Sequence, residues 1–87
     1  MTDEQVQRYR DETDGTSKVI HLNNAGASLP PNVVKEAVFT YLEEEMTYGG
    51  YETHTRHFEE YEKVYDAVAE LLNADRSEIA IMENATV

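Results

Sequence analysis

The spacing of apolar residues changes several times along this chain, and each change predicts a different element. After Pro31, apolar side chains recur three and four residues apart, which is the spacing of one helix face. The members of this face are Val34, Ala37, Val38, Tyr41 and Leu42. Pro31 suits a first helical turn because its missing N–H is not needed there, and Gly49 with Gly50 marks an end. We therefore predict a helix over residues 31–47.

A second apolar stripe predicts another helix over residues 55–73. Its members are Phe58, Tyr61, Tyr65, Val68 and Leu72. We interpret this stripe as core rather than as a stacking platform. Asn73 follows it in "NADRS", and asparagine is suited to the left-handed conformation that ends many helices.

Two short apolar runs are typical of strands. "KVIHL" predicts a strand near residues 18–22, and "EIAIM" predicts one near 78–82 that leads into the helix-start signal "NAT". A buried strand needs paired neighbours, so we expect a sheet that this segment begins and does not complete. The polar residues 1–17 predict a flexible N-terminal arm with a possible short helix.

Length and cysteine content limit what the chain does alone. Eighty-seven residues form at most one small domain, and such a domain buries only roughly 60% of its unfolded surface. No cysteine is present, so disulfides and thiolate metal sites are excluded within these residues, and we predict no metal site. The thin core predicts a homo-oligomer formed through apolar side chains that need cover. These are Phe58, Tyr61, Tyr65, Leu72, Ile79 and Ile81.

The charge balance bears on possible partners. The formal net charge is -11, which repels phosphate backbones and anionic lipid surfaces, so we expect no nucleic acid and no membrane as partner. The first residues lack the apolar run of a signal peptide, and no stretch approaches the roughly 20 apolar residues of a membrane helix. We expect a soluble, cytoplasmic protein.

Three blocks of the sequence together resemble a known enzyme family. "IHLNNAGASLPP", "YGGYETHTR" and "AELLNADRSEIAIMENATV" occur in the order and spacing of the N-terminal part of class V aminotransferases. These enzymes are fold type I and depend on pyridoxal phosphate, and they include cysteine desulfurases and selenocysteine lyases. The resemblance covers residues 18–87 and implies an α/β, transferase-like fold with a mainly parallel sheet and an amino-acid substrate. The chain itself is then expected to be a truncated segment, mostly α-helical, with two main helices plus short strands.

The resemblance implies that one segment lies close to the amino-acid substrate. It consists of Asn23, Asn24, Ala25, Gly26 and Ala27. Small residues let a backbone approach a ligand closely, and amide side chains satisfy exposed main-chain groups. From the residues alone, the favoured interpretation is a simple turn that prolines join to a helix.

A second segment resembles the family's cofactor-phosphate site. Thr86 matches a phosphate-binding position, and Asn84 and Ala85 flank it. Ala85 stands where many desulfurases carry a second threonine, which removes one hydroxyl but leaves the backbone N–H. The plainer interpretation of this turn is a helix N-cap.

The third block resembles a loop that reaches the neighbouring subunit's active site in family dimers. Tyr51, His54 and Arg56 are therefore candidates for the dimer interface or substrate entrance. The alternatives are that Tyr51 anchors the core, that His54 is a solvated loop residue and that Arg56 pairs with Glu59 or Glu60.

The cofactor chemistry of the family needs residues that have no counterpart in this sequence. Pyridoxal phosphate is held by a lysine as a Schiff base, and an acid keeps its ring nitrogen protonated. Lys18, Lys35 and Lys63 do not match that lysine. We therefore assign no catalytic residue and expect the chain to be inactive alone, with transaminase, lyase and desulfurase chemistry all open. The alternative is a free-standing acidic helical module that self-associates or docks on a partner.

Overall fold

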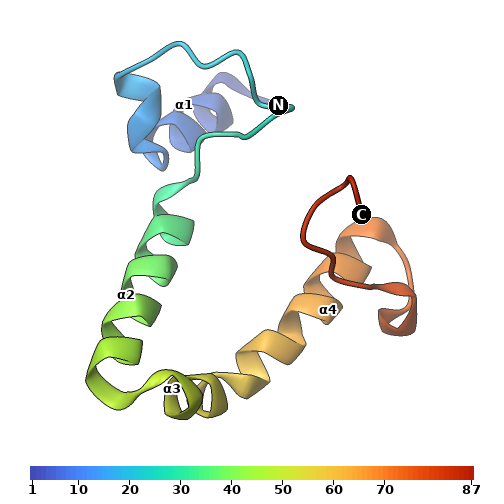
Figure 1. Ribbon diagram of the computed structural model, residues 1–87. Coiled ribbons are helices and arrows are strands. Elements are labelled where there is room, and N and C mark those ends of the chain that lie inside the picture. Colours follow the sequence, from blue (N-terminus) through green and yellow to red (C-terminus); the bar gives the residue numbers. More distant parts are fainter. The chain divides into compact units, whose positions relative to one another are not determined.

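The computed structural model describes residues 1–87 and is built from helices joined by turns (Figure 1). The α-helices are α1 (Asp3–Asp11), α2 (Asn32–Tyr48), α3 (Gly50–Arg56) and α4 (Phe58–Leu72), and the 3-10 helices are η1 (Asp14–Ser17) and η2 (Arg76–Glu78). The chain divides into two compact units, Met1–Thr47 and Tyr48–Val87.

The arm of the first unit contains a helix because its N-terminus is capped and its charges suit the helix dipole. The Thr2 hydroxyl accepts a hydrogen bond from the Gln5 N–H, and the Gln5 side chain accepts one from the Thr2 N–H at 2.8 Å. This reciprocal pair is a capping box, which satisfies two N–H groups that a helix start leaves open. Acidic residues fill the first turn and Arg8 and Arg10 the last, which complements the helix dipole. These contacts account for α1 in a stretch with few apolar side chains.

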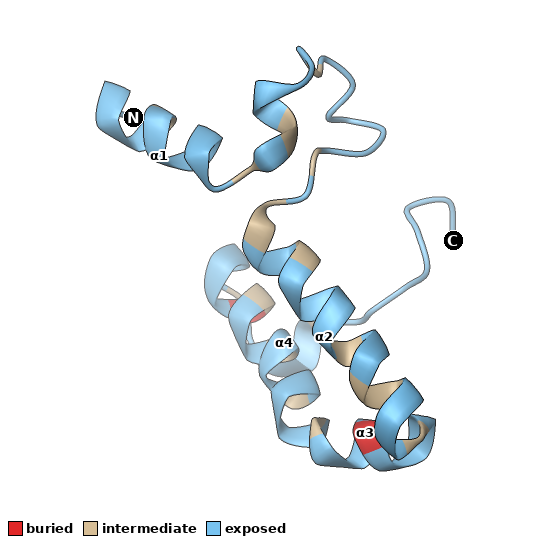
Figure 2. Ribbon diagram, turned by 90° about the vertical axis from the view of Figure 1, so that its left-hand side faces the viewer, coloured by how far each residue is buried: buried red, intermediate tan, exposed pale blue.

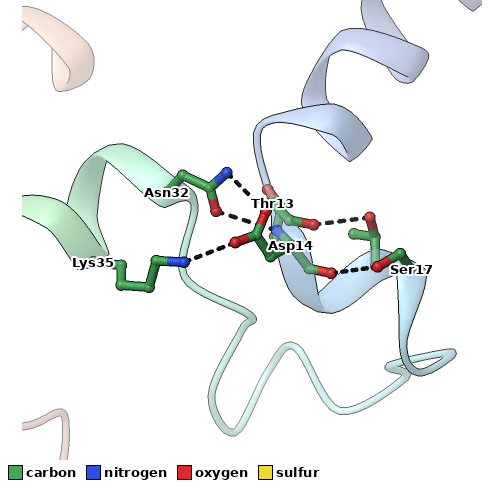
Figure 3. Close-up of polar contacts among 6 residues, drawn as sticks. Thr13, Asp14, Ser17, Asn32 and Lys35 are labelled. Carbon is green, nitrogen blue, oxygen red and sulfur yellow. Dashed lines mark hydrogen bonds and ion pairs between the residues drawn. The ribbon is translucent and has the colours of Figure 1, made fainter.

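Asp14 joins η1 to the start of α2 through a cluster of polar contacts (Figure 3). Its carboxylate accepts hydrogen bonds from Lys35 Nζ at 2.7 Å and from Asn32 Nδ2 at 3.0 Å, and its N–H donates to Asn32 Oδ1 at 3.2 Å. The Asn32 N–H donates to the carbonyl of Glu12 at 2.7 Å. We call Asp14, Asn32 and Lys35 the Asp14 clasp, and it ties the arm to α2.

The second unit is organised around Arg76, which holds η2 against α4. Its guanidinium forms ion pairs with Glu62 and, at 3.0 Å, with Asp66, and it lies 5.2 Å from the centre of the Tyr65 ring. The Glu62 carbonyl also accepts a hydrogen bond from Arg76 at 3.0 Å. We call these four residues the Arg76 clamp. Hydrogen bonding to Glu62, with the charges of both carboxylates, raises the pKa of Arg76, so the clamp's cation persists at alkaline pH.

One of the two predicted helices is present almost as predicted, and the other is divided into two. The helix predicted over 31–47 is α2, displaced by one residue, and it stops before Gly49, whose φ is +96°. The helix predicted over 55–73 is divided, because His57 leaves the helical conformation at φ -102° and ψ 11° and so separates α3 from α4. Asn73 adopts the left-handed conformation predicted for it, with φ 53° and ψ 48°.

The predicted α/β fold class is wrong. No strand is present in residues 1–87, and the segments predicted as strands at 18–22 and 78–82 are irregular, apart from Glu78, which belongs to η2. A strand is stabilised by hydrogen bonds to a neighbouring strand, and neither segment has a partner in this chain. Their apolar side chains stay uncovered: Ile20 is 91% exposed and Ile81 is 61% exposed.

Burial is slight throughout the chain (Figure 2). Ala69 is the one buried apolar residue and Thr53 the one buried polar residue. The α4 stripe that we interpreted as core is largely open, since Phe58 and Leu72 are 52% and 64% exposed. Polar contacts and helix caps therefore fix the local structure more than a core does.

None of the helices combines the length and apolar character that crossing a membrane requires.

Candidate functional site

The predicted substrate-proximal segment, Asn23 to Ala27, forms an exposed turn in the first unit. The carbonyl of Asn23 accepts hydrogen bonds from the N–H groups of Gly26 and Ala27, each at 3.2 Å. The His21 ring closes the turn, because its Nε2 donates to the Ala27 carbonyl at 2.7 Å. The turn interpretation from the sequence is thus confirmed, and it leaves the substrate interpretation untested.

Gly26 lies close to the side chain of Asn23 in this turn. A Cβ at Gly26 would lie 3.1 Å from Asn23 Oδ1 and 3.2 Å from Asn23 Nδ2, which is closer than carbon atoms normally approach such groups. The close neighbour of Gly26 is therefore the side chain of Asn23, and the predicted approach of this backbone to a ligand stays a prediction. Asn24 donates from Nδ2 to the His21 carbonyl at 3.4 Å.

An open hollow of about 700 Å³ lies between α1 and the segment that leads into this turn. Asn24 and His21 border it from the turn, and Arg10 borders it from α1. Of the five predicted substrate-proximal residues, Asn24 is the one that lines this hollow. The N-terminal arm therefore forms one wall of this hollow.

The predicted phosphate segment, Asn84 to Thr86, is an exposed turn in the second unit. The Thr86 N–H donates to Asn84 Oδ1 at 2.9 Å, and the Val87 N–H donates to the Asn84 carbonyl at 3.3 Å. The Ala85 N–H and the Thr86 hydroxyl make no hydrogen bond within the chain. These two groups are therefore not used by contacts within the chain.

A pyridoxal phosphate group needs more than this turn offers. Its phosphate carries close to two negative charges and several acceptor oxygens, and proteins usually meet it with several N–H donors or a cation. Arg76, the last basic residue of the chain, is engaged by Glu62 and Asp66. The residues present therefore do not fit the whole group, and we derive no reaction step through it.

The residues predicted for a dimer or entrance loop lie on a helix instead. Tyr51, His54 and Arg56 belong to α3, which starts directly after Gly49 and carries an acidic first turn and a basic last turn. These charges complement the helix dipole, which favours a helix here over the predicted loop. Tyr51 is 90% exposed, so the alternative that it anchors the core is wrong.

Aromatic contacts hold the other two residues of this group. The His54 ring stacks on Tyr61 with 5.0 Å between ring centres. The Arg56 guanidinium lies over the Tyr48 ring, 4.2 Å from its centre, rather than pairing with Glu59 or Glu60. A cation over an aromatic face is a stabilising contact, so Arg56 braces the start of this unit.

Two features were missed by sequence reasoning. Arg10 was not singled out, although it is the arginine without an ion pair or ring contact, while Arg8 pairs with Glu12 at 2.8 Å. The Asp14 clasp was also missed, because it joins Asp14 to Asn32 and Lys35, which are 18 and 21 residues further along the chain. No group of acidic or histidine side chains that could hold a metal ion occurs in the chain.

Comparison with known proteins adds no relative to this description. No protein-family model, curated protein or solved structure matches the chain significantly.

Proposed function

We propose that this chain is the N-terminal segment of a cytoplasmic, pyridoxal-phosphate-dependent enzyme that resembles class V aminotransferases and acts on an amino acid. The support is the sequence resemblance over residues 18–87 and one structural observation. Each of the two turns that the resemblance relates to ligands follows directly on an apolar run whose side chains are uncovered.

The exposure of these runs carries the proposal. Before the first turn, Ile20 and Leu22 are 91% and 89% exposed, and before the second, Ile81 and Met82 are 61% and 58% exposed. Large apolar side chains gathered at a surface usually meet other protein. Further polypeptide that covers these runs would bring other residues beside both turns.

The role of each residue in the proposed enzyme follows from the chemical groups that this chain provides. Asn24 and the backbone of the first turn contribute to binding of the amino acid, and the Ala85 N–H with the Thr86 hydroxyl contributes part of the phosphate site. The Schiff-base lysine and the acid at the ring nitrogen come from other polypeptide. Alone, the chain has no activity, and in the complete enzyme it takes part in a homo-oligomer.

The test is made on the complete reading frame that contains these codons. We expect its product to show the absorbance of bound pyridoxal phosphate, and Thr86→Val to weaken cofactor binding severalfold because one hydroxyl donor is lost. Asn24→Asp should weaken amino-acid affinity more than it lowers the melting temperature. Thr40→Val is the matched control, since Thr40 lies on α2 outside both turns. A product with no cofactor lysine and no cofactor absorbance would refute the proposal.

A second function is favoured by the open apolar face of α4. Phe58, Val64 and Leu72 are 52%, 43% and 64% exposed on a helix whose other side is acidic. This arrangement suits an acidic helical module that self-associates or docks on a partner. A reading frame that encodes only this helical region, with a dimer detected by sedimentation, would favour that function over the enzyme.

A further inference from the structure

The hollow of the first unit has an unusual charge pattern. The chain carries 18 acidic residues among 87, yet none of the eleven residues that line the hollow is aspartate or glutamate. Arg10 provides the only charged side chain of the lining. In a chain with net charge -11, this hollow is a local exception that favours an anion.

Arg10 is free to bind a ligand, unlike the other arginines. Arg8, Arg56 and Arg76 are each engaged by a carboxylate or an aromatic ring. Arg10 also lines a second hollow, together with the carboxylates of Asp11 and Asp14. Both carboxylates have other partners, because Asp11 accepts a hydrogen bond from Gln7 at 2.8 Å and Asp14 belongs to the clasp. The planar guanidinium of arginine can donate two parallel hydrogen bonds to a carboxylate.

The rest of the lining is suited to an apolar body. Its larger apolar side chains are Val6, Tyr9, Val19, Ile20 and Leu29. Val19 and Ile20 are 53% and 91% exposed, so a ligand there would remove apolar surface from water. The volume of about 700 Å³ exceeds what a chain of several methylene groups occupies.

We propose that this hollow binds a small amphipathic carboxylate, with its carboxylate on Arg10 and its apolar chain along Val19, Ile20 and Leu29. The Asp14 clasp supports the site, because it fixes η1 and so keeps α1 beside the segment that forms the opposite wall. This binding goes beyond the proposed enzyme function. It uses residues of the first unit alone and needs no pyridoxal phosphate.

The experiment is a titration of the 87-residue chain with octanoate below its micelle concentration, followed by two-dimensional NMR of the backbone amides. We expect saturable shifts confined to α1 and residues 19–29. Octan-1-ol, which lacks the charge, and acetate, which lacks the chain, should each bind more weakly than octanoate.

Variants test the two halves of the site separately. Arg10→Gln should weaken octanoate binding roughly fivefold, as expected for loss of a solvent-exposed ion pair. Arg8→Gln is the matched control on the same helix and should leave the affinity unchanged, because Arg8 does not line the hollow. Ile20→Glu should abolish binding by placing a carboxylate in the lining, and its backbone spectrum would show whether the unit remains folded.

Three results would overturn the proposal. They are shifts that do not saturate, equal affinities of Arg10→Gln and Arg8→Gln, and shifts spread over α4 as well as the first unit. The hollow shares Asn24 with the turn proposed to bind the amino acid, but Arg10, Val19 and Leu29 lie outside that turn. A chain that fails this test can therefore still belong to a pyridoxal-phosphate enzyme, and the reverse also holds.

Discussion

The two units of the chain use a charged side chain of opposite sign for the same structural purpose. In the first unit the carboxylate of Asp14 gathers Asn32 and Lys35, and in the second the guanidinium of Arg76 gathers Glu62 and Asp66. Each cluster ties a 3-10 helix to a longer α-helix. The difference is that the second unit also buries Ala69 and ends α4 at a left-handed Asn73, while the first unit buries no side chain.

This difference explains why we expect the amphipathic carboxylate to bind in the first unit. The second unit uses Arg56 and Arg76 for its own structure, whereas the first unit leaves Arg10 unpaired beside an acid-free hollow. The first unit also has a source of pH dependence in its clasp, because hydrogen bonds from Lys35 and Asn32 lower the pKa of the Asp14 carboxyl group. The predictions below separate the two units by these properties.

The largest expected effect is a loss of structure in the second unit. Ala69→Asp places a charge at the buried position of α4, which costs about 3 kcal/mol when the charge has no partner. Ala67→Asp is the matched control, because Ala67 is exposed on the same helix. We expect circular dichroism to show lost helicity for Ala69→Asp only, with the NMR signals of residues 1–29 unchanged. Equal effects of the two variants would show that Ala69 is not buried in solution.

A smaller effect is expected at the end of α4. Asn73 has φ 53° and ψ 48°, and a left-handed conformation costs an alanine about 1 kcal/mol while glycine adopts it freely. Asn73→Ala should therefore lower the thermal stability of the second unit, and Asn73→Gly should leave it within a few tenths of a kcal/mol. Identical melting curves for Asn73→Ala and Asn73→Gly would contradict the left-handed cap.

The smallest effect is the pH dependence of the first unit. Hydrogen bonds from Lys35 and then Asn32, with the Lys35 charge, hold the pKa of Asp14 below its ordinary value. A depressed carboxyl pKa contributes stability that is fully present above the unfolded value, near about 4, and is lost as pH falls through the folded value. We expect the NMR signals of Asp14 and the Asn32 side chain to change in that acid range.

Two substitutions check the origin of this pH dependence. Asp14→Asn should remove it, because the side chain no longer titrates, and Asp11→Asn should leave it in place because Asp11 is outside the clasp. Persistence of the same transition in Asp14→Asn would assign it to another group.

Some features of the fold could be predicted from the sequence because they depend on local chemistry. The spacing from Val34 to Leu42 predicted α2, and the residue type of Asn73 predicted its left-handed cap. The strands near 18–22 and 78–82 could not be predicted correctly, because a strand depends on a neighbour and this chain provides none. An apolar run such as "KVIHL" indicates that its side chains should be buried, but it does not show whether this chain provides the residues that would bury them.

The local conformation of the candidate turns could also be predicted, whereas the roles assigned to their residues stay predictions. The turn at Asn23 to Ala27 and the exposed Thr86 hydroxyl were found from residue types that favour turns. Arg10 and the Asp14 clasp were missed because they join residues far apart in sequence, such as Asp14 and Lys35. Their contacts depend on how the chain folds back between η1 and α2, and no local pattern reports that.

The most direct test of the central claim is whether the 87-residue chain forms a cofactor site of its own. Purified chain would be mixed with pyridoxal phosphate, followed by absorbance, reduced with borohydride and analysed by mass spectrometry. We predict no stoichiometric adduct, since Lys18, Lys35 and Lys63 do not match a cofactor lysine. A stoichiometric adduct at one of these lysines would contradict the account, because the chain would then hold the chemistry that we assign to other polypeptide.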